Sequence, residues 1–513
     1  MMRRFYVTFS LVVACALASS AQNSLSFYHL GNATFQNSYY NPALIPEGKV
    51  FVGLPVLSGI HMNFNNKFNY KDVIIQGEVQ KEIDLNLYLK SLQKNNMVSM
   101  TTAFNLFHFG ITTRGGSTLA LYANERIEMD FLYPKSLMEF LIKGNAGSKG
   151  ETVKIGKTRL STTYFREFGL GYSTNVSSDL SIGVRAKYLQ GFLNGSTPGG
   201  FTADLTTNKE DYSISLDMRD ATFRTSGMDI FQGNTGNLGT HLISNNNRGA
   251  AIDLGFNLNM GPDYTISGSI TDIGFISWKE DIKNYTLADT TMTYSGIDLK
   301  DPGDLVQTIE DSLINKFKNR NSETDNPYTT IISPKAYLSW TYHAHNGGDV
   351  IATGGARYIQ GQMKFLLGAG YRHSFGKFFV GTVNVTKLPQ QFFNMGAALA
   401  LKGGPAQMYL AVDQVVNYDL TKFQAIDVRF GINFIIGQKE PESLMEANKP
   451  KVKRTKAGTQ SFLGQKVDVK GQEGIYTIIN KQERRKKRDY EFEGDPIPKE
   501  KNRFKQRSPK ERY

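Results

Sequence analysis

Strict alternation of apolar and polar residues recurs along this chain and limits its fold more than any other feature. In "IDVRFGINFIIG" at 426–437, every second residue from Ile426 to Ile436 is apolar. Successive side chains of a strand point to opposite faces, so this segment predicts a strand with one apolar and one polar face. The second face carries Asp427, Arg429, Gly431 and Asn433.

Thirteen further segments show the same alternation, and Gly- and Asp-containing turns link several of them. Most are roughly 9–13 residues long, which is enough to cross a membrane when tilted. We predict fourteen strands, at 50–64, 102–112, 118–131, 164–175, 179–190, 249–260, 264–275, 335–344, 350–358, 363–372, 378–387, 392–401, 406–414 and 426–436.

The connections between these segments alternate between short and long. A membrane barrel has short turns at one rim and longer loops at the other. All four of the longest connections fall on the same side: 65–101, 132–163, 191–248 and 276–334. We therefore predict an all-β fold, a transmembrane antiparallel β-barrel of about 14 strands. "DYSISLDM" at 211–218 is also strand-like, so a barrel of sixteen strands remains an alternative.

A soluble β-sandwich is the main alternative, because its strands also alternate. Sandwich strands are usually shorter, and one face of each would lie in a dry core. Here the second face carries charged residues such as Glu167, Arg185 and Lys187. Charged side chains suit a polar lumen, which favours the membrane barrel.

The N-terminal stretch "MMRRFYVTFSLVVACALASSAQ" has the make-up of an export signal. Two arginines precede an apolar run that is too short to span a membrane, and small residues follow. We predict a signal peptide over 1–21, cleaved after Ala21, and hence a mature protein without cysteine. "VVAC" also fits a lipoprotein box that would leave Cys15 lipidated, and this alternative stays open.

Positive charge is concentrated behind the last predicted strand. The net charge is +12, and residues 439–513 contain 21 Lys and Arg against 12 Asp and Glu, or +9. The remaining chain is almost neutral, which argues against a nucleic-acid partner. We expect 438–513 to be a partly disordered periplasmic extension that captures an anionic partner, such as peptidoglycan or an acidic protein. Its densest basic run is Arg484, Arg485, Lys486, Lys487 and Arg488.

Helical spacing of apolar residues occurs in three of the long connections, at 83–93, 135–144 and 303–317. We expect these helices to pack over the barrel mouth. In the C-terminal extension, "KVDVKGQEGIYTIIN" at 466–480 predicts a short hairpin.

The last strand resembles the terminal-strand signal of outer-membrane barrels. That signal has a polar residue, then a glycine, then two spaced apolar residues, and the matching positions are Arg429, Gly431, Phe434 and Ile436. The resemblance implies that the barrel-assembly machinery reads this strand. It also implies a barrel in the lipid of a Gram-negative outer membrane, with both termini periplasmic.

A second resemblance lies before the first strand. Asn41, Pro42 and Ala43 resemble the hatch segment of the FadL superfamily of fatty-acid transporters, which includes the PorV-type barrels of Bacteroidetes. Residues from about 24 to 437, beginning "SFYHLGNATFQNSYYNPALIPEGK", are similar to a Bacteroidetes outer-membrane family of unassigned function. The resemblance implies a hatch or plug over 22–48 and a fourteen-strand barrel over 49–437. An ordinary leader into the first strand is the alternative.

No arrangement of residues in the sequence predicts catalysis, a metal or a cofactor. His343 and His345 are two apart, but no cysteine or third histidine is nearby, and no G-x-S-x-G motif occurs. We expect the histidines on the surface or in turns, and we expect no enzymatic activity. Interior glycines are expected to make room for a plug or to relieve curvature: Gly169, Gly171, Gly183 and Gly368.

Two functions fit these observations. The first is a structural or docking subunit of an outer-membrane complex, acting through its loops and basic tail, since a plain transporter has no use for such a tail. The alternative is a FadL-like conduit for hydrophobic small molecules with a movable hatch.

Overall fold

The computed structural model describes most of the chain between residues 25 and 479, in two units, Met1–Ser443 and Leu444–Tyr513. The described residues are 25–66, 73–76, 81–219, 221–228, 246–286, 290–294, 322–344, 347–376, 378–387, 394–413, 425–437, 453–454, 459–462, 465–472 and 475–479.

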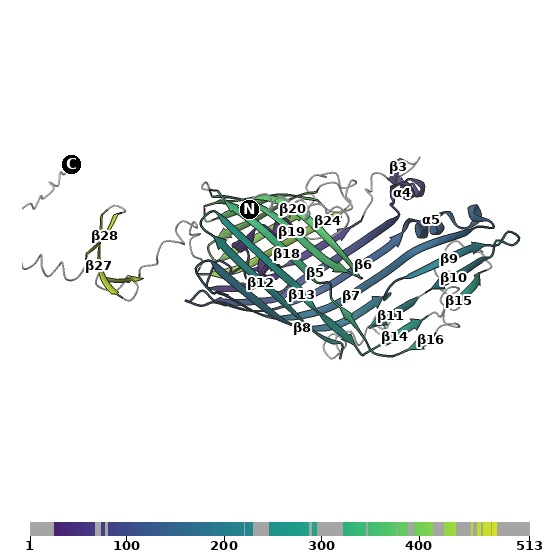
Figure 1. Ribbon diagram of the computed structural model, residues 1–513, viewed down its shortest axis with the longest axis horizontal. Helices are drawn as coiled ribbons and strands as arrows, with labels where there is room; N and C mark the ends of the chain where they lie inside the picture. The colour runs from purple at the N-terminus through teal and green to yellow at the C-terminus, as the bar shows by residue number, and fades with distance from the viewer. Residues whose placement is uncertain are drawn as a thin grey trace, which may run out of the picture. The chain divides into compact units, whose positions relative to one another are not determined.

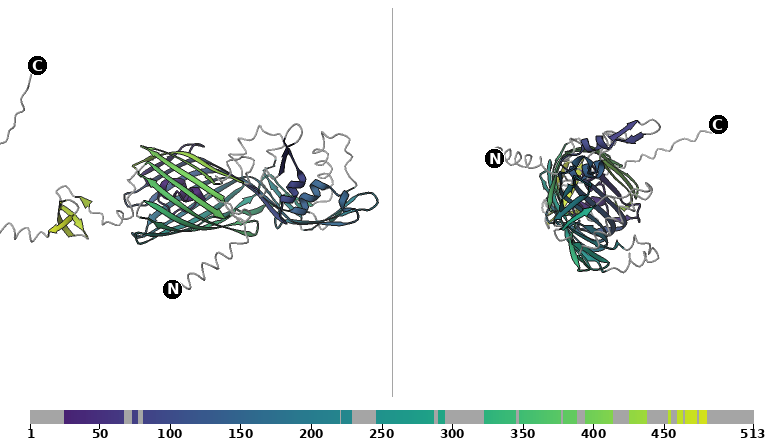
Figure 2. Two further views of the ribbon diagram at one scale, coloured as in Figure 1. Left: turned by 90° about the horizontal axis from the view of Figure 1, so that it is seen from above. Right: turned by 90° about the vertical axis from the view of Figure 1, so that its right-hand side faces the viewer.

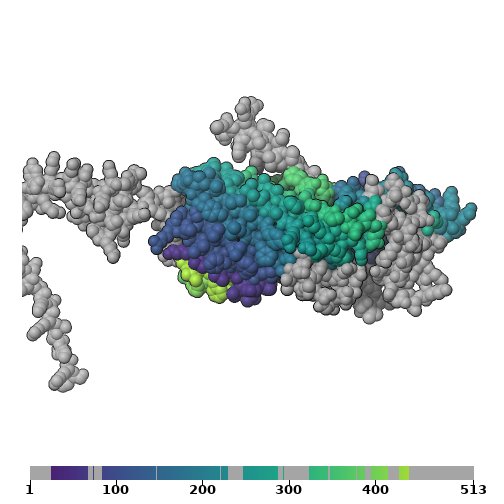
Figure 3. Space-filling model, turned by 90° about the horizontal axis from the view of Figure 1, so that it is seen from below, coloured from purple at the N-terminus to yellow at the C-terminus, as the bar shows by residue number. Residues whose placement is uncertain are grey.

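The first unit contains a closed antiparallel barrel of fourteen strands (Figure 1). Its first strand has two parts, β1 (Val50–Gly53) and β2 (Ile60–Asn65), and both parts pair with the last strand, β24 (Ala425–Ile436). Figure 3 shows these last strands, in yellow-green, beside the first residues, in purple. The other strands of the ring are β5 (Asn95–Thr112), β6 (Thr118–Pro134), β7 (Thr152–Asn175), β8 (Leu180–Ser196), β12 (Arg248–Met260), β13 (Tyr264–Trp278), β18 (Lys335–His343), β19 (Gly348–Ile359), β20 (Gln362–Phe375), β21 (Phe379–Lys387), β22 (Asn394–Gly403) and β23 (Ala406–Asp413).

The fourteen-strand prediction is confirmed, but the first strand is not continuous over 50–64 as predicted. Pro55 has no N–H to donate to a neighbouring strand, and Val56 has a φ of 63°. The backbone therefore leaves the ladder between β1 and β2. The loop still supplies hydrogen bonds to the wall, since the Val56 amide donates to the Asn105 carbonyl at 2.7 Å.

The sixteen-strand alternative is not realised. Residues of "DYSISLDM" do form a strand, β10 (Ile214–Arg219), but this strand pairs with β9 (Phe201–Thr207) and β15 (Thr290–Tyr294) outside the ring.

The outward face of the barrel is a belt of exposed apolar side chains. Leu119 and Leu121 on β6 are each 48% exposed, and the neighbouring strands continue the pattern. A water-soluble protein rarely exposes so large an apolar surface, whereas lipid requires it. Ring closure leaves no backbone edge unpaired in the bilayer. The ring is therefore a transmembrane β-barrel. Further members of this belt are Leu170, Tyr172, Ile182, Val184, Ile252, Leu254, Phe256, Ile270, Leu338 and Trp340.

Strands β5 to β8 continue past one rim of the barrel and carry additional strands; we call this part the extension (Figures 1 and 2). Its buried side chains include Trp278, whose Nε1 donates to Thr330 Oγ1 at 2.9 Å, and Tyr328. Burial raises the pKa of the Tyr328 phenol, so it stays protonated and donates to Asn194 Oδ1 at 3.0 Å. Besides β9, β10 and β15, the added strands are β11 (Thr222–Ser226), β14 (Ile282–Thr286), β16 (Ser322–Thr324) and β17 (Tyr328–Ile331).

Two of the three predicted loop helices are present in the extension. They are α4 (Leu85–Ser91) and α5 (Lys135–Lys143), and 303–317 lies outside the described residues. Asp84 caps α4 by accepting from the Asn86 and Leu87 amides. Small elements β3 (Ile74–Gln76), β4 (Lys81–Ile83) and η4 (Ala146–Ser148) complete this part. None of the helices in the described part of the chain is long and apolar enough to cross a membrane.

The second unit contains an antiparallel sheet of four strands, β25 (Lys453–Arg454), β26 (Thr459–Phe462), β27 (Gln465–Gln472) and β28 (Ile475–Ile479). The predicted hairpin is confirmed, since Gln472 pairs with Ile475 across its turn. The predicted signal peptide at 1–21 and the basic run 484–488 lie outside the described residues.

Candidate functional site

Residues 25–48, which we call the plug, lie inside the barrel. They form α2 (Leu25–Tyr28), η2 (Gly31–Ala33) and η3 (Phe35–Tyr39), and most of their side chains are buried. Side chains from strands all around the ring donate to plug carbonyls, so the segment is held in the lumen: Arg185 to Ser38, Ser269 to Tyr40, Thr382 to Ser26 and Gln407 to Ala33.

The tripeptide Asn41-Pro42-Ala43 forms a turn against the wall at β8 and β12. Asn41 is fully buried; its Nδ2 donates to the Phe256 carbonyl at 3.0 Å, and its Oδ1 accepts from the Ala43 amide at 2.9 Å. Asparagine followed by proline favours such a turn, because the side chain bonds the backbone two residues on. The tripeptide therefore fixes one end of the plug against the wall.

Glycines on the lumen face leave the space that the plug fills. A Cβ on Gly183 would lie 2.2 Å from the Pro42 carbonyl atoms, and one on Gly368 would lie 2.3 Å from the Leu25 side chain. Two of the glycines named from the sequence therefore make room for the plug. The other two do not: a Cβ on Gly169 would collide with the Tyr122 ring, and a Cβ on Gly171 would lie 3.6 Å from Arg185 Nε.

The broken first strand also contacts the plug. Gln36 Nε2 donates to the Ser58 carbonyl and to Asn433 Oδ1, both at 2.6 Å. Tyr409 on β23 donates to the same Ser58 carbonyl at 2.9 Å. Because the backbone leaves the ladder here, the Ser58 carbonyl points into the lumen and accepts a hydrogen bond from the plug residue Gln36.

Beyond the plug, toward the extension, buried ion pairs cross the lumen. Arg126 binds Asp272 through two bonds of 2.9 Å, and Asp272 also accepts from Lys187 at 2.6 Å and from Lys335 at 2.9 Å. Sequence alternation marked Glu167, Arg185 and Lys187 as lumen-facing, and the structure gives each of them an oppositely charged partner in the lumen. The further pairs are Arg126–Glu167, Lys187–Asp253, Arg185–Asp253, Arg357–Glu128 and Arg357–Asp130.

Asp272 reaches this position because of a β-bulge. The register between β12 and β13 shifts between Ile252 and Leu254, and Asp272 takes a φ of 62°. Two residues, Thr271 and Asp272, consequently oppose Asp253 alone, and both are buried in the lumen. Simple alternation would have turned Asp272 outward, so the sequence pattern missed it.

Between the plug and this network lies a small polar chamber of about 120 Å³. Tyr39 and Tyr40 of the plug bound it on one side, and six Lys and Arg side chains and three carboxylates line it. The cationic residues are Arg126, Arg185, Lys187, Lys335, Arg357 and Arg429; the carboxylates are Glu167, Asp272 and Asp427.

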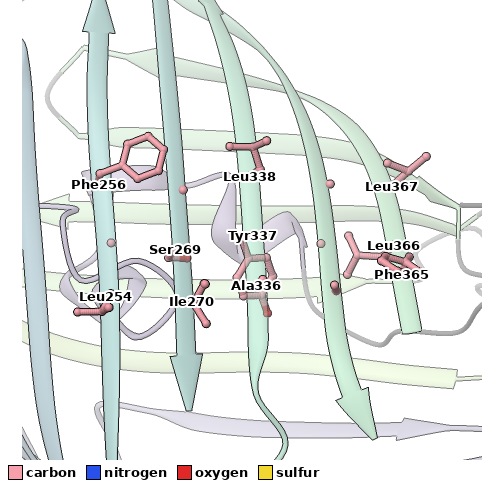
Figure 4. A pocket seen from close by; sticks show the side chains of 15 residues that line it. Leu254, Phe256, Ser269, Ile270, Ala336, Tyr337, Leu338, Phe365, Leu366 and Leu367 are labelled. Carbon is pink, nitrogen blue, oxygen red and sulfur yellow. The ribbon is translucent and has the colours of Figure 1, made fainter. Parts of the chain in front are cut away.

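An apolar groove of about 680 Å³ lies in the wall at β12, β13, β18, β19 and β20 (Figure 4). Small outward positions, Gly268, Ala336, Gly354 and Ala356, form its hollow. Figure 4 shows larger side chains around it, and Leu254, Ile270 and Leu338 among them are exposed on the outer face. The groove therefore opens on the lipid-facing side of the barrel.

The inner side of the same stretch of wall holds the plug. Ser269 donates to the Tyr40 carbonyl at 2.6 Å, and a Cβ on Gly255 would lie 2.1 Å from Asn41 Oδ1. Tyr337 packs on Tyr28 and Tyr40 with ring centroids 5.4 Å apart in each pair. Four residues of this inner side also line the groove: Gly255, Ser269, Tyr337 and Leu366. One thin stretch of wall thus separates an apolar groove from the plug.

Each histidine that the structure describes has a side-chain partner in the barrel or the plug. The expectation of surface or turn positions is wrong for His29 and His108, which are buried against Thr353 and Tyr39. These contacts with the plug join residues that are far apart in the sequence, so local sequence pattern could not predict them. Within the described residues, no group of three or more metal-binding side chains lies close enough to hold an ion. His241 and His345 lie outside the described residues.

One row of side chains has the order of a nucleophile, a base and an acid. Thr265 Oγ1 lies 2.8 Å from His343 Nε2, and His343 Nδ1 lies 2.6 Å from Asp349 Oδ1. The Thr265 hydroxyl donates to Asn259 Oδ1 at 3.0 Å, so its proton is not directed at His343. Arg372 holds the other Asp349 oxygen at 2.7 Å. This geometry suits a wall-stabilising network rather than an activated nucleophile.

The four residues of the terminal-strand pattern divide between the two faces of β24. Phe434 and Ile436 are exposed on the outer face, whereas Arg429 lines the chamber. Gly431 is closely packed, since a Cβ there would lie 2.4 Å from the Ser58 carbonyl oxygen.

The match to a family model places the chain among proteins of the same kind. Residues 42–413 match the "Family of unknown function (DUF5723)", and the chain belongs to this family. No curated protein matches the chain.

Solved structures similar to the chain include a Pseudomonas aeruginosa FadL homologue, at 8% identity and a TM-score of 0.38, over 81% of this chain and 99% of that one. The Ralstonia pickettii toluene transporter TbuX matches at 8% identity and a TM-score of 0.36, over 78% and 92%. The Pseudomonas putida toluene transporter TodX matches at 8% and 0.34, over 82% and 94%. The barrel architecture of this chain is defined by its own strand pairing.

Proposed function

We propose that this protein is an outer-membrane channel for hydrophobic small molecules, closed by its N-terminal plug. The observation that supports this function is the apolar groove, which opens toward lipid and shares its wall with the residues that hold the plug. An apolar molecule concentrates in the bilayer, and a preformed apolar hollow that faces lipid receives it without exposing it to water. The groove has the size and chemistry of such a site.

The proposed channel requires the plug to move. At Asn41-Pro42-Ala43 its contacts with the wall include hydrogen bonds, and the wall residues that face it there include glycines, which the plug backbone approaches closely. In this proposal the tripeptide is the hatch of the channel. The terminal-strand residues Arg429, Gly431, Phe434 and Ile436 guide assembly, and the rim at Val50 and Ile436 faces the periplasm.

The test is uptake of the uncharged fluorophore N-phenyl-1-naphthylamine by cells that produce the full chain. Gly354→Leu fills the groove, because a Cβ at Gly354 has only one neighbour, Leu367 at 3.6 Å. Ala397→Leu on β22 is the matched control on the outer face away from the groove. The proposal expects faster uptake with the wild type and the control than with Gly354→Leu. Equal uptake in all strains, including one without the protein, would reject it.

Docking in a larger outer-membrane complex is the second candidate, favoured by the separate unit Leu444–Tyr513 and its basic sequence. An anionic periplasmic component would be its partner. Affinity purification of the full chain and of a form truncated after Gly437 separates the two functions. Partners lost on truncation would support docking, and equal recovery from both forms would reject it.

A further inference from the structure

We infer that the polar chamber between the plug and the ion-pair network binds one small oxyanion, with Arg429 as its principal ligand. This inference does not depend on the proposed channel function. It starts from one lining cation, Arg429, that has no hydrogen-bonded carboxylate, although six cationic side chains and three carboxylates face the chamber. The carboxylates that balance the remaining cations, Glu128, Asp130 and Asp253, are not part of that lining.

Arg429 is the cation that lacks a proper partner. Its guanidinium has no hydrogen bond within the described part of the chain, and its Nε lies 4.0 Å from Asp427 Oδ1. The group stacks instead over two rings, 4.9 Å from Tyr40 and 5.3 Å from Phe27. The other five chamber cations each have a carboxylate partner at 3.5 Å or less: Arg126, Arg185, Lys187, Lys335 and Arg357. A guanidinium held flat on aromatic rings keeps its N–H groups available for a planar or tetrahedral oxyanion.

Two phenols supply independent evidence for a ligand. Tyr40 and Tyr337 both line the chamber, are 6% and 4% exposed, and have hydroxyl groups without a hydrogen-bond partner. Their rings lie 5.4 Å apart. Buried hydroxyl groups without partners are rare in proteins, so these two indicate an occupant. An oxyanion in the chamber would have both phenols and the guanidinium among its candidate donors.

The size of the chamber limits the occupant. The chamber of about 120 Å³ has room for several water molecules or for one ion the size of phosphate, sulfate or acetate. The chamber also has acceptors without partners, Asn63 Oδ1 and Asp427 Oδ1. These two oxygen atoms cannot donate a hydrogen bond to an oxyanion. Water and an oxyanion therefore differ as occupants, because water satisfies both donors and acceptors, whereas an oxyanion satisfies only the donors.

The experiment is equilibrium dialysis of the purified full chain in detergent against labelled phosphate, sulfate or acetate in chloride buffer. We expect saturable binding of at least one of the three, with one ion per barrel. Binding of acetate alone would identify a carboxylate ligand, and binding of phosphate or sulfate alone would identify a tetrahedral one. Absence of saturable binding of all three would overturn the inference and leave water as the occupant.

Variants locate the site. Arg429→Gln is expected to weaken binding at least about tenfold, since it removes the charged donor. Lys402→Gln is the matched control: this lumen cation pairs with Glu47 and does not line the chamber. If Arg429→Gln fails to assemble, Tyr40→Phe with Tyr337→Phe removes only the two hydroxyl groups and is expected to weaken binding severalfold. Affinities equal to the wild type in these variants would overturn the assignment.

Discussion

Gly183→Ala is predicted to loosen the plug without disturbing the barrel. The added Cβ would lie 2.2 Å from the Pro42 carbonyl carbon and oxygen and 2.5 Å from the Ala43 nitrogen. These are backbone atoms of the plug, so no side-chain rotation relieves the contact. Gly183 itself is held in β8 by pairing with Ser173 and Gly255 on its two sides, and the plug must therefore give way.

The size of the effect follows from the cost of overpacking, about 1–3 kcal/mol for an inserted methyl group in a closely packed site. At 25 °C this cost corresponds to about a 5- to 150-fold shift of the plug toward its displaced state. Gly195→Ala is the matched control, because Gly195 lies on the same strand and a Cβ there meets nothing within 4 Å.

Hydrogen exchange measured by mass spectrometry reports the displaced state directly. Backbone bonds protect the amides of Asn37, Tyr40, Asn41 and Leu44. Their exchange should accelerate in Gly183→Ala by a factor in that range and should stay at the wild-type rate in Gly195→Ala. Unchanged plug exchange in Gly183→Ala, or faster exchange spread over the barrel strands, would refute the reasoning.

Two further substitutions test the lumen and the extension. Asp272→Asn removes the carboxylate that Arg126, Lys187 and Lys335 share. The free energy of unfolding should fall by about 3–5 kcal/mol, measured by unfolding in urea and followed by the gel mobility of the folded form. Asp179→Asn, at an exposed turn, is the control and should change the free energy of unfolding by less than about 0.5 kcal/mol. Similar losses of stability in the two variants would contradict the role of the ion-pair network. Trp278→Ala empties a fully buried position in the extension, and a cost of about 3–5 kcal/mol should make the extension sensitive to protease while β18–β24 stay resistant. Equal protease resistance in wild type and variant would show that Trp278 does not hold the extension together.

Local sequence pattern was sufficient for most of the barrel. Each ring strand alternates, and a side chain such as Leu170 or Arg185 faces lipid or lumen as its position in the alternation predicts. The exceptions are places where backbone geometry departs from a simple strand. Pro55 and Val56 break the first strand, and the bulge at Asp272 turns two neighbouring residues inward.

The candidate site was less predictable, because its parts are far apart in sequence. Asn41 could be named from a short motif, but its contact with Phe256 spans 215 residues. The pairing of Arg126 with Asp272 and the burial of His108 against Tyr39 are likewise contacts between distant segments. The groove depends on small outward residues on several strands, among them Gly268 and Gly354, and no single strand reveals it.

A disulfide that fastens the plug to the wall tests the central proposal most directly. A Cβ at Gly255 would lie 3.1 Å from Asn41 Cγ, near the position that the sulfur of Asn41→Cys would take, so Asn41→Cys with Gly255→Cys brings the two side chains within reach of a disulfide. The measurement is uptake of N-phenyl-1-naphthylamine by this variant before and after reduction, beside each single variant. A channel that opens by movement of the plug should show little uptake in the oxidised double variant and recovery on reduction, with no effect of the reductant on the single variants. Equal uptake in the oxidised and reduced double variant would show that hydrophobic molecules do not pass by way of the plug.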